Sequence, residues 1–300
     1  MQHRTMLRIL FPLALSALAG PAAGQQGTDI FVGRLSLSGG QIVVSQLRNA
    51  TNRNGYDNQP SFDPTGAFVL YTSGRPDGQT EIFRYDIAAG GSENVTNTPE
   101  SEYSPTPMPG GATFSVIRVE ADSAQRLWSF DMDGRNPKLL LEDIMPVGYH
   151  AWGNERMLAL FVLGAPSTLQ LADANTGRAS VIERSIGRSL HRIPGQLAIS
   201  FVHKVSDDEW WIKRLDLRTQ QITPLIHTVP GSEDYAWTPG GVVVMGSGSV
   251  LYQWRSGAIG WSVVADLADQ GIEGITRIAV SEAGDRIAIV GERGAGSEEP

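Results

Sequence analysis

The stretch Ser61-Phe-Asp-Pro-Thr-Gly66 is a small turn, and it leads directly into the apolar run Ala67-Phe-Val-Leu-Tyr-Thr-Ser73. Turns of this kind, each followed by a short apolar strand, recur along the rest of the chain. They begin at Asp63, Met108, Gly153, Ile193, Thr238 and Ser281, in steps of 45, 45, 40, 45 and 43 residues. A period of about 40 to 45 residues with four strands per repeat is typical of β-propeller blades.

A second series of residues supports this period independently. Four alternating segments end in an aspartate and then run into a polar turn, which is a hairpin signal. These aspartates are Asp86, Asp131, Asp173 and Asp216, in steps of 45, 42 and 43 residues. No segment of useful length after residue 24 has a helical period, so the sequence predicts an all-β fold.

The two chain ends together supply the strands of one blade. After Ser281 only one clear strand remains, Arg286-Ile-Ala-Ile-Val290, whereas Asp29-Ile-Phe-Val32 near the other end resembles Glu81-Ile-Phe-Arg84. We therefore expect a six-bladed β-propeller of four-stranded blades, with the last blade closed by strands from both termini. Its inner strands are expected at about 275–290 and its outer strands at about 29–46, a closure that leaves no free sheet edge. The alternative is a five-bladed ring with a separate hairpin.

Three segments of the chain differ in composition. Arg4 and Arg8 precede the apolar run Ile9 to Ala19, which is typical of a secretory signal peptide and too short to span a bilayer comfortably. We expect residues 1–24 to be the signal peptide, with no membrane span after its cleavage. Residues 25–291 are expected to form the propeller, and the small, acidic residues 292–300 a disordered tail.

Composition excludes several kinds of site. The chain has 0 cysteines, so disulfides, thiolate metal sites and cysteine nucleophiles are all excluded. Its net charge is −8, and no basic stripe with interleaved aromatic residues is present. Nucleic acid is therefore not an expected partner.

One blade resembles a known repeat. The segment Pro60-Ser-Phe-Asp-Pro-Thr-Gly66, its following strand and Ile82-Phe-Arg-Tyr-Asp86 are similar to the repeat of the TolB propeller, a WD-type architecture. The resemblance extends over residues 29–290 as architecture and is specific near 58–99. Two features of related proteins are missing: the α/β domain that precedes the propeller in TolB, and the Gly-x-Ser-x-Gly elbow of propeller-bearing peptidases. A complete Tol-system role and a serine peptidase role are therefore not expected.

In a propeller, the connections that enter the inner strands surround the channel mouth. Aromatic and charged residues recur just before the turns of the repeat. The candidate ligand-binding residues are Tyr56, Asp57, Asn58, Glu102, Tyr103, Tyr149, His150, Arg188, His191, Glu233, Asp234, Tyr235, Glu273 and Arg277. Carboxylates beside tyrosine rings suit a cationic or hydrogen-bonding ligand. The alternative is that these side chains only seal the junctions between blades.

A catalytic alternative uses the same mouth. Six-bladed propellers also include hydrolases that hold a metal ion there, and Ca²⁺ needs several converging oxygen ligands. Possible ligands are Asp57, Asn58, Glu102, Asp234 and Glu273, with His150 or His191 as a base or further ligand. No spacing motif singles these residues out, and lone histidines are more often structural.

The sequence therefore predicts a periplasmic or secreted propeller that acts as a non-catalytic binding or scaffold module of the cell envelope. The partner is expected to be another envelope protein or a peptide bound at the channel mouth, and the protein is expected to be a monomer without a cofactor. The alternative is a Ca²⁺-dependent hydrolase or lyase that acts at the same mouth.

Overall fold

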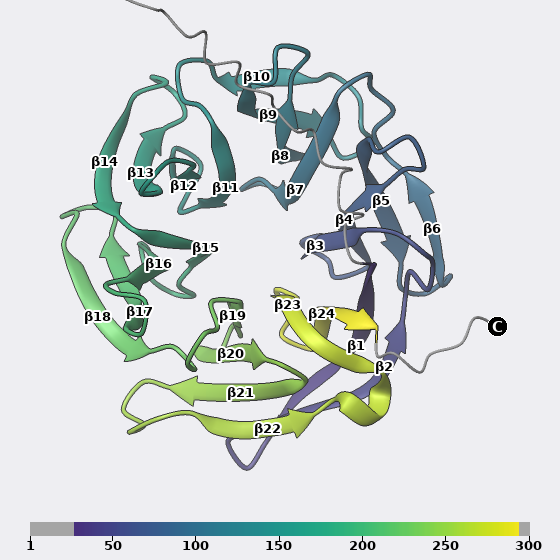
Figure 1. Cartoon of the computed structure of the whole chain (residues 1–300), viewed down its shortest axis with the longest axis vertical. Coiled ribbons are helices and arrows are strands. Elements are labelled where there is room, and N and C mark those ends of the chain that lie inside the picture. The colour runs from purple at the N-terminus through teal and green to yellow at the C-terminus, as the bar shows by residue number, and fades with distance from the viewer. Residues whose placement is uncertain (1–26, 294–300) are drawn as a thin grey trace, which may run out of the picture.

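The computed structural model describes residues 27–293 and shows six four-stranded antiparallel sheets arranged in a ring (Figure 1). The predicted signal peptide and most of the predicted tail lie outside the described residues. We number the blades from the first complete sheet in the chain. Blade 1 contains β3 (Asp57–Phe62), β4 (Phe68–Gly74), β5 (Thr80–Asp86) and β6 (Gly91–Asn94). Blade 2 contains β7 (Ser101–Pro107), β8 (Thr113–Val119), β9 (Gln125–Asp131) and β10 (Lys138–Leu141).

The next three blades repeat this order. Blade 3 contains β11 (Val147–Trp152), β12 (Met157–Val162), β13 (Thr168–Asp173) and β14 (Ala179–Arg184). Blade 4 contains β15 (Ile186–Arg192), β16 (Ala198–Lys204), β17 (Trp210–Asp216) and β18 (Ile222–His227). Blade 5 contains β19 (Tyr235–Trp237), β20 (Val242–Ser247), β21 (Val250–Arg255) and β22 (Ser262–Asp266), and a short helix η1 (Ala268–Gln270) follows it.

Blade 6 is composite, which confirms the predicted closure. Its inner strands are β23 (Ile272–Val280) and β24 (Arg286–Arg293), and its outer strands are β1 (Thr28–Ser38) and β2 (Gln41–Asn49). β1 pairs with β24 from the Thr28–Glu292 pair to the Arg34–Arg286 pair. Because this pairing joins both ends of the described chain in one sheet, the five-bladed alternative is wrong.

The hydrophobic core is divided among the junctions between blades. Each of the six junctions holds one cluster of buried residues contributed by the two facing blades. The second strands lie between these clusters and are buried on both faces, as in the run Val69 to Ser73 of β4 and Phe114 to Arg118 of β8. Burial on both faces favours consecutive apolar residues, such as Val69-Leu-Tyr71 and Val116-Ile117, over strict alternation.

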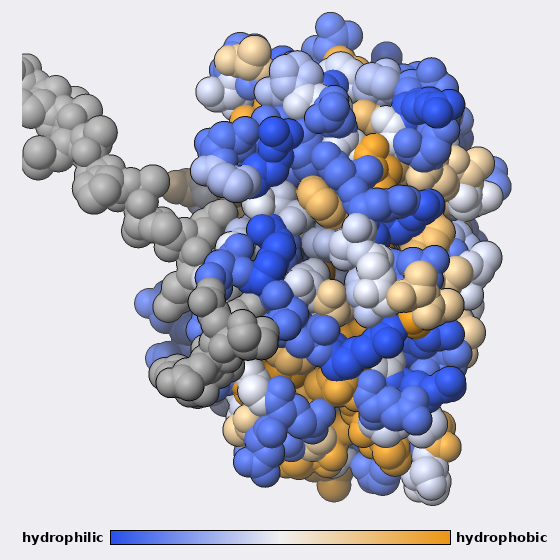
Figure 2. Space-filling view, turned by 90° about the vertical axis from the view of Figure 1, so that its right-hand side faces the viewer, coloured by the Kyte–Doolittle hydropathy of each residue, from blue (hydrophilic) through white to orange (hydrophobic). Residues whose placement is uncertain are grey.

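The outer rim of the ring has a different character. Figure 2 shows one side of it, where hydrophilic residues predominate and hydrophobic residues are interspersed. The most exposed large hydrophobic side chains of the described residues include Ile259 and Val263 in blade 5 and Leu37 in blade 6. No helix among residues 27–293 is long and apolar enough to cross a membrane.

One turn glycine lies where two blades touch, and its replacement tests how closely the blades approach. A Cβ added at Gly134, in the turn after β9, would lie 1.9 Å from the carbonyl oxygen of Val95 in blade 1. Gly177 occupies the corresponding turn of blade 3 with a similar φ of +69°, and nothing lies within 4 Å of its added Cβ. We expect Gly177→Ala to cost about 1 kcal/mol from backbone strain alone. Gly134→Ala is expected to cost ~2 kcal/mol more, because the Val95 backbone must shift.

Urea unfolding of the two variants beside the wild type measures this difference. Equal losses in the two variants would contradict the close contact between blades 1 and 2.

Candidate functional site: the central channel

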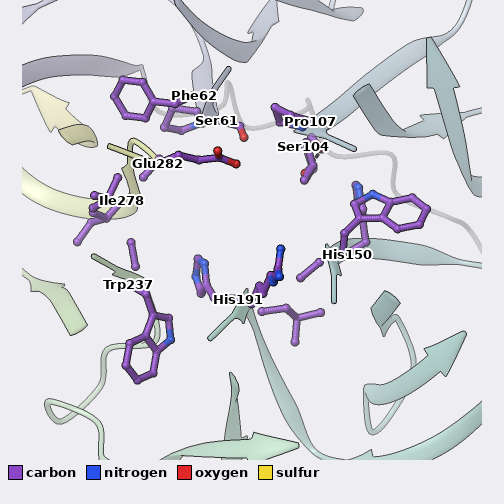
Figure 3. Close-up of a pocket in the computed structure, with 18 of the residues that line it drawn as sticks. Ser61, Phe62, Ser104, Pro107, His150, His191, Trp237, Ile278 and Glu282 are labelled. Atoms are coloured by element: carbon purple, nitrogen blue, oxygen red, sulfur yellow. Dashed lines mark hydrogen bonds between the residues drawn. The ribbon is translucent and has the colours of Figure 1, made fainter. Parts of the chain in front are cut away.

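A channel of about 910 Å³ runs along the axis of the ring. Its lining comes from all six inner strands, β3, β7, β11, β15, β19 and β23, and from the turns that follow them. Figure 3 shows lining residues from every blade around one common space, among them Ser61, Ser104, His150, His191, Trp237 and Ile278. The channel is therefore the one place in the described structure where side chains of all six repeats converge.

Irregular pairing of the inner strands turns particular side chains toward this space. The register of β3 shifts between Asn58 and Ser61, and that of β7 shifts between Tyr103 and Thr106. Gln59 and Ser104 occupy these bulges with φ of 57° and 55°, a region that non-glycine residues adopt only when the fold imposes it. The side-chain oxygen of Gln59 accepts hydrogen bonds from Thr72 Oγ1 at 2.8 Å and from the Ser104 amide at 3.0 Å. This bond from blade 1 to blade 2 fixes both bulges.

Six predicted residues, one from each blade, gather at the mouth where the inner strands begin. Tyr149, Arg188, Asp234 and Arg277 line the channel. Burial raises the pKa of Tyr56, and the proximity of Tyr149 and Tyr103 raises it further, whereas Arg277 lowers it. We call the six residues the mouth ring: Tyr56, Tyr103, Tyr149, Arg188, Asp234 and Arg277.

Asp234 is the centre of the ion pairs in the mouth ring. Its Oδ2 accepts from Arg188 Nη2 at 2.8 Å, and its Oδ1 accepts from Arg277 Nη1 at 2.9 Å. Arg277 also donates to the hydroxyl of Tyr149 at 2.8 Å, and its guanidinium lies 5.1 Å from the centre of that ring. One carboxylate thus holds two guanidinium groups against the tyrosine side of the ring.

Glu233 is also neutralised. Its Oε2 accepts from the Arg188 amide at 2.8 Å, and its Oε1 lies 3.3 Å from the ammonium of Lys204. The acidic residues of the sequence predicted a cationic or hydrogen-bonding ligand, but Arg188, Arg277 and Lys204 outnumber Glu233 and Asp234 in this cluster. The structure changes that expectation, because the carboxylates of this part of the mouth are already paired.

Asp57 and Asn58 lie at a blade junction. The side chain of Asp57 is fully buried and accepts from Arg53 Nη2 at 2.8 Å and from Ser73 Oγ at 2.7 Å. Burial raises the pKa of Asp57, and the hydrogen bonds from Arg53 and Ser73 oppose that shift. The carbonyl of Asp57 accepts from Thr28 Oγ1 of blade 6 at 2.9 Å. Asp57 therefore connects blades 6 and 1, and the buried side chain of Asn58 accepts from the adjacent Gln59 amide.

Glu102 lies at the next junction, where it meets a second buried carboxyl group. Its Oε1 accepts from Thr98 Oγ1 at 2.5 Å and lies 3.2 Å from Arg118 Nε. Glu81 of β5 is equally buried, and Thr96 donates to Glu81 at 2.7 Å. Burial raises the pKa of Glu102 to about 8, and the neighbouring Glu81 contributes to this shift. This carboxyl group is therefore protonated near neutral pH, a state that does not suit a metal ligand.

The two predicted histidines have different surroundings. His150 is buried, with Nε2 2.6 Å from Ser115 Oγ, and burial lowers its pKa to about 3. His191 is partly exposed to the channel lumen and lies 4.6 Å from the ring of Tyr235. Its pKa is lowered to about 4, chiefly by its position inside the protein and also by Arg277. Both imidazoles are neutral at pH 7. Glu273 is exposed and does not line the channel.

Tyr235 belongs to a packing motif that occurs twice. Its hydroxyl and the indole N–H of Trp237 both donate to Ser200 Oγ of blade 4, each at 2.8 Å. Two blades earlier, Trp152 donates to Ser115 Oγ at 2.9 Å, beside His150. In both places a tryptophan at the end of an inner strand donates to a serine in the second strand of the preceding blade, so these tryptophans connect neighbouring blades.

The opposite mouth of the channel holds residues that were not predicted from the sequence. The turns after the inner strands line it with four prolines, Pro64, Pro109, Pro194 and Pro239. Two exposed charged residues, Arg192 and Glu282, also lie there. The Pro-Gly turns that revealed the repeat carried this signal, since turns at equivalent positions of successive blades meet at one end of the ring.

Several predicted metal ligands are held by other partners. Asp57 and Asp234 each pair with an arginine, Glu102 accepts a hydrogen bond from Thr98, and Glu273 lies outside the channel. Within residues 27–293, no group of three or more His, Cys, Asp or Glu side chains is arranged to hold a metal ion.

Comparison with solved structures places the fold. The chain is similar to a TolB-like protein from Agrobacterium tumefaciens, with a TM-score of 0.71 and 13% identity over 91% of this chain and 100% of the other. It is also similar to TolB from Acinetobacter baumannii, with a TM-score of 0.56 and 16% identity over 89% of this chain and 64% of that one. A chain of a nidogen–laminin complex matches with a TM-score of 0.62 and 10% identity over 84% and 98%.

These similarities show a TolB-like six-bladed β-propeller, and at such identities they show the fold alone. No protein-family model matches the chain, and no curated protein matches it.

Proposed function

We propose that this protein is an exported, non-catalytic propeller of the cell envelope whose central channel binds a peptide segment of a partner protein. The observation that carries the proposal is the channel itself, which is lined by all six blades and has aromatic and guanidinium groups at one mouth. The apolar run at residues 9–19 supports export. The TolB-like fold is compatible with binding to another envelope protein.

The catalytic alternative has less support. A metal-dependent hydrolase needs free oxygen ligands that converge, whereas Asp57 and Asp234 pair with arginines at separate places and Glu102 is buried at a blade junction. The buried Ser115–His150 contact does not favour a nucleophile either, because the Ser115 side chain is fully buried. The proposed function therefore includes neither a cofactor nor Ca²⁺.

Site-specific photo-crosslinking in the producing cells tests this proposal. A photoreactive amino acid at Glu282, an exposed residue that lines the channel mouth, is expected to give one discrete adduct. The same amino acid at Leu37, which is 55% exposed on the outer rim, is the matched control and is expected to give none. Adducts at Leu37 but not at Glu282 would contradict binding in the channel. A hydrolytic activity of the wild type that is lost in Asp234→Ala would contradict the non-catalytic role.

A further inference from the structure

The charge of the channel lining is opposite in sign to that of the chain. The whole chain has a net charge of −8. Among the fully ionised residues that line the channel, three are cationic and two are anionic: Arg188, Arg192, Arg277, Asp234 and Glu282. With both lining histidines held neutral by lowered pKa values, the hollow has one positive charge in excess. An acidic protein with a cationic hollow favours an anionic occupant there.

This excess is concentrated in the mouth ring and its immediate neighbours. Arg188, Arg277 and Lys204 share only two carboxylates, Asp234 and Glu233. The cluster is therefore one negative charge short of neutrality. Because the side chains of Asp234 and Arg277 are only 9% and 14% exposed, water screens them incompletely. One more carboxylate would complete the charge balance.

The two guanidinium groups also have hydrogen-bonding capacity for such a group. A guanidinium has five N–H donors arranged for planar acceptors. Arg277 donates through Nη1 and Nη2, and Arg188 donates through Nε and Nη2. Among the described residues, Nε of Arg277 and Nη1 of Arg188 have no hydrogen-bond partner in the structure. A carboxylate from an occupant could therefore bind here without displacing Asp234.

Deeper in the channel, two lining residues hold polar atoms without a protein partner. Ser104 Oγ and His150 Nδ1 make no hydrogen bond to the described residues, and both residues are less than a tenth exposed. Buried polar groups of this kind normally have a partner. Neither atom is exposed to the channel lumen, so the binding of a chain that enters from the mouth ring depends on the guanidinium groups rather than on these two atoms.

The shape of the channel favours a peptide over a small ion. Its lining on β23 extends over six residues, from Arg277 in the second half of the strand to Glu282 beyond its end. Six residues of extended chain span ~20 Å at about 3.3 Å per residue. An extended segment of similar length could contact both mouths.

We infer that the occupant of the channel is an acidic peptide segment, and that Arg188 and Arg277 bind one of its carboxylates. This inference rests on the proposed function, since it names the chemistry of the peptide that the channel binds. The carboxylate belongs either to an Asp or Glu side chain or to a free chain end, and both have the same planar acceptor geometry.

Selection from a displayed library of random dodecapeptides tests the inference with the intact protein. One half of the library presents a free carboxyl end and the other an amidated end, which separates the two sources of the carboxylate. We expect the binders selected on the wild type to be enriched in acidic groups. Arg277→Gln is expected to weaken their binding at least tenfold. Arg135→Gln removes the same charge from a side chain that is 80% exposed and unconnected with the channel, and it is expected to leave binding unchanged.

The outcomes separate this inference from the proposed function. The inference would be overturned if the peptides that bind in the channel were not enriched in acidic groups, or if Arg277→Gln left their affinity unchanged. Peptide binding in the channel would still hold. Failure to select any peptide that protects the Glu282 position from crosslinking would contradict both. Arg277→Lys keeps the charge but loses the planar fork, and it is expected to retain partial affinity. Melting temperatures of all variants show whether the fold survives.

Discussion

A chain that begins at Thr51 is expected to lose its cooperative unfolding transition. Such a chain lacks β1 and β2, so the long edge of β24 has no partner and blade 6 keeps only two strands. The loss also removes buried side chains from two junctions. Ile30 and Val32 pack against blade 1, and Phe31, Leu35 and Ile42 pack against blade 5. The free energy of unfolding of a domain is only about 5–15 kcal/mol, so the loss of this many buried groups is expected to exceed it.

Two point variants in β1 separate the effect of closure from that of shortening the chain. Ile30 is 1% exposed, and Ile30→Ala is expected to cost ~2–5 kcal/mol in the free energy of unfolding. Leu37 in the same strand is 55% exposed, and Leu37→Ala is expected to change it by no more than about 0.5 kcal/mol. Urea unfolding followed by tryptophan fluorescence measures all three proteins. A cooperative transition in the shortened chain would mean that the other five blades form a stable unit without closure.

The architecture was predictable because each blade obeys the same local rules. The turns from Asp63 to Ser281 and the aspartates from Asp86 to Asp216 recur at the blade period, and the second strands contain consecutive apolar residues. The composite blade was predictable for a related reason. Only one clear strand follows Ser281, and the missing outer-strand pattern is found at the other end of the chain, in Asp29-Ile-Phe-Val32. Repetition allows one ambiguous segment to be judged against five others.

The mouth was predictable in position but not in charge. Tyr149, Arg188, Asp234 and Arg277 all line the channel, because residues at equivalent points of a repeat meet at one end of the ring. Which carboxylates are free depends on partners far away in the sequence. Arg188 reaches Asp234 across 46 residues, and Arg277 reaches Tyr149 across 128. Pairings between blades leave no signal in local spacing, so the cationic excess emerged only from the structure.

The contact between Glu102 and Glu81 could not be predicted for the same reason, since it too joins two blades. The two residues lie on β7 and β5, in different blades, and nothing in either segment indicates that their carboxyl groups meet. From its place in the repeat, Glu102 was therefore predicted to lie at the mouth. In the structure it is a fully buried group at the junction of blades 1 and 2.

We expect Glu102→Gln to remove a large part of the pH dependence of stability. The pKa of Glu102 is about 8 in the folded protein, raised from an ordinary value of 4.5 by burial and by Glu81. Below pH 4.5 the group is protonated in both states and favours neither. Between pH 4.5 and 8 the unfolded chain ionises while the folded protein keeps its proton, so stability falls as the pH rises. Above pH 8 the loss is complete.

Free energies of unfolding at pH 5 and pH 8.5 measure this effect. At pH 5 glutamine replaces a neutral carboxyl group of the same shape, so the variant and the wild type are expected to be similar. At pH 8.5 the variant is expected to be the more stable by on the order of 5 kcal/mol, because the pKa rises from 4.5 to about 8 and each pKa unit corresponds to about 1.4 kcal/mol. Glu93→Gln changes an exposed carboxylate of the adjacent blade, 61% exposed, and its pH profile should follow that of the wild type. If the Glu102→Gln profile also runs parallel to the wild type, Glu102 is already ionised in the folded protein, and Arg118 rather than a shared proton stabilises the carboxyl pair.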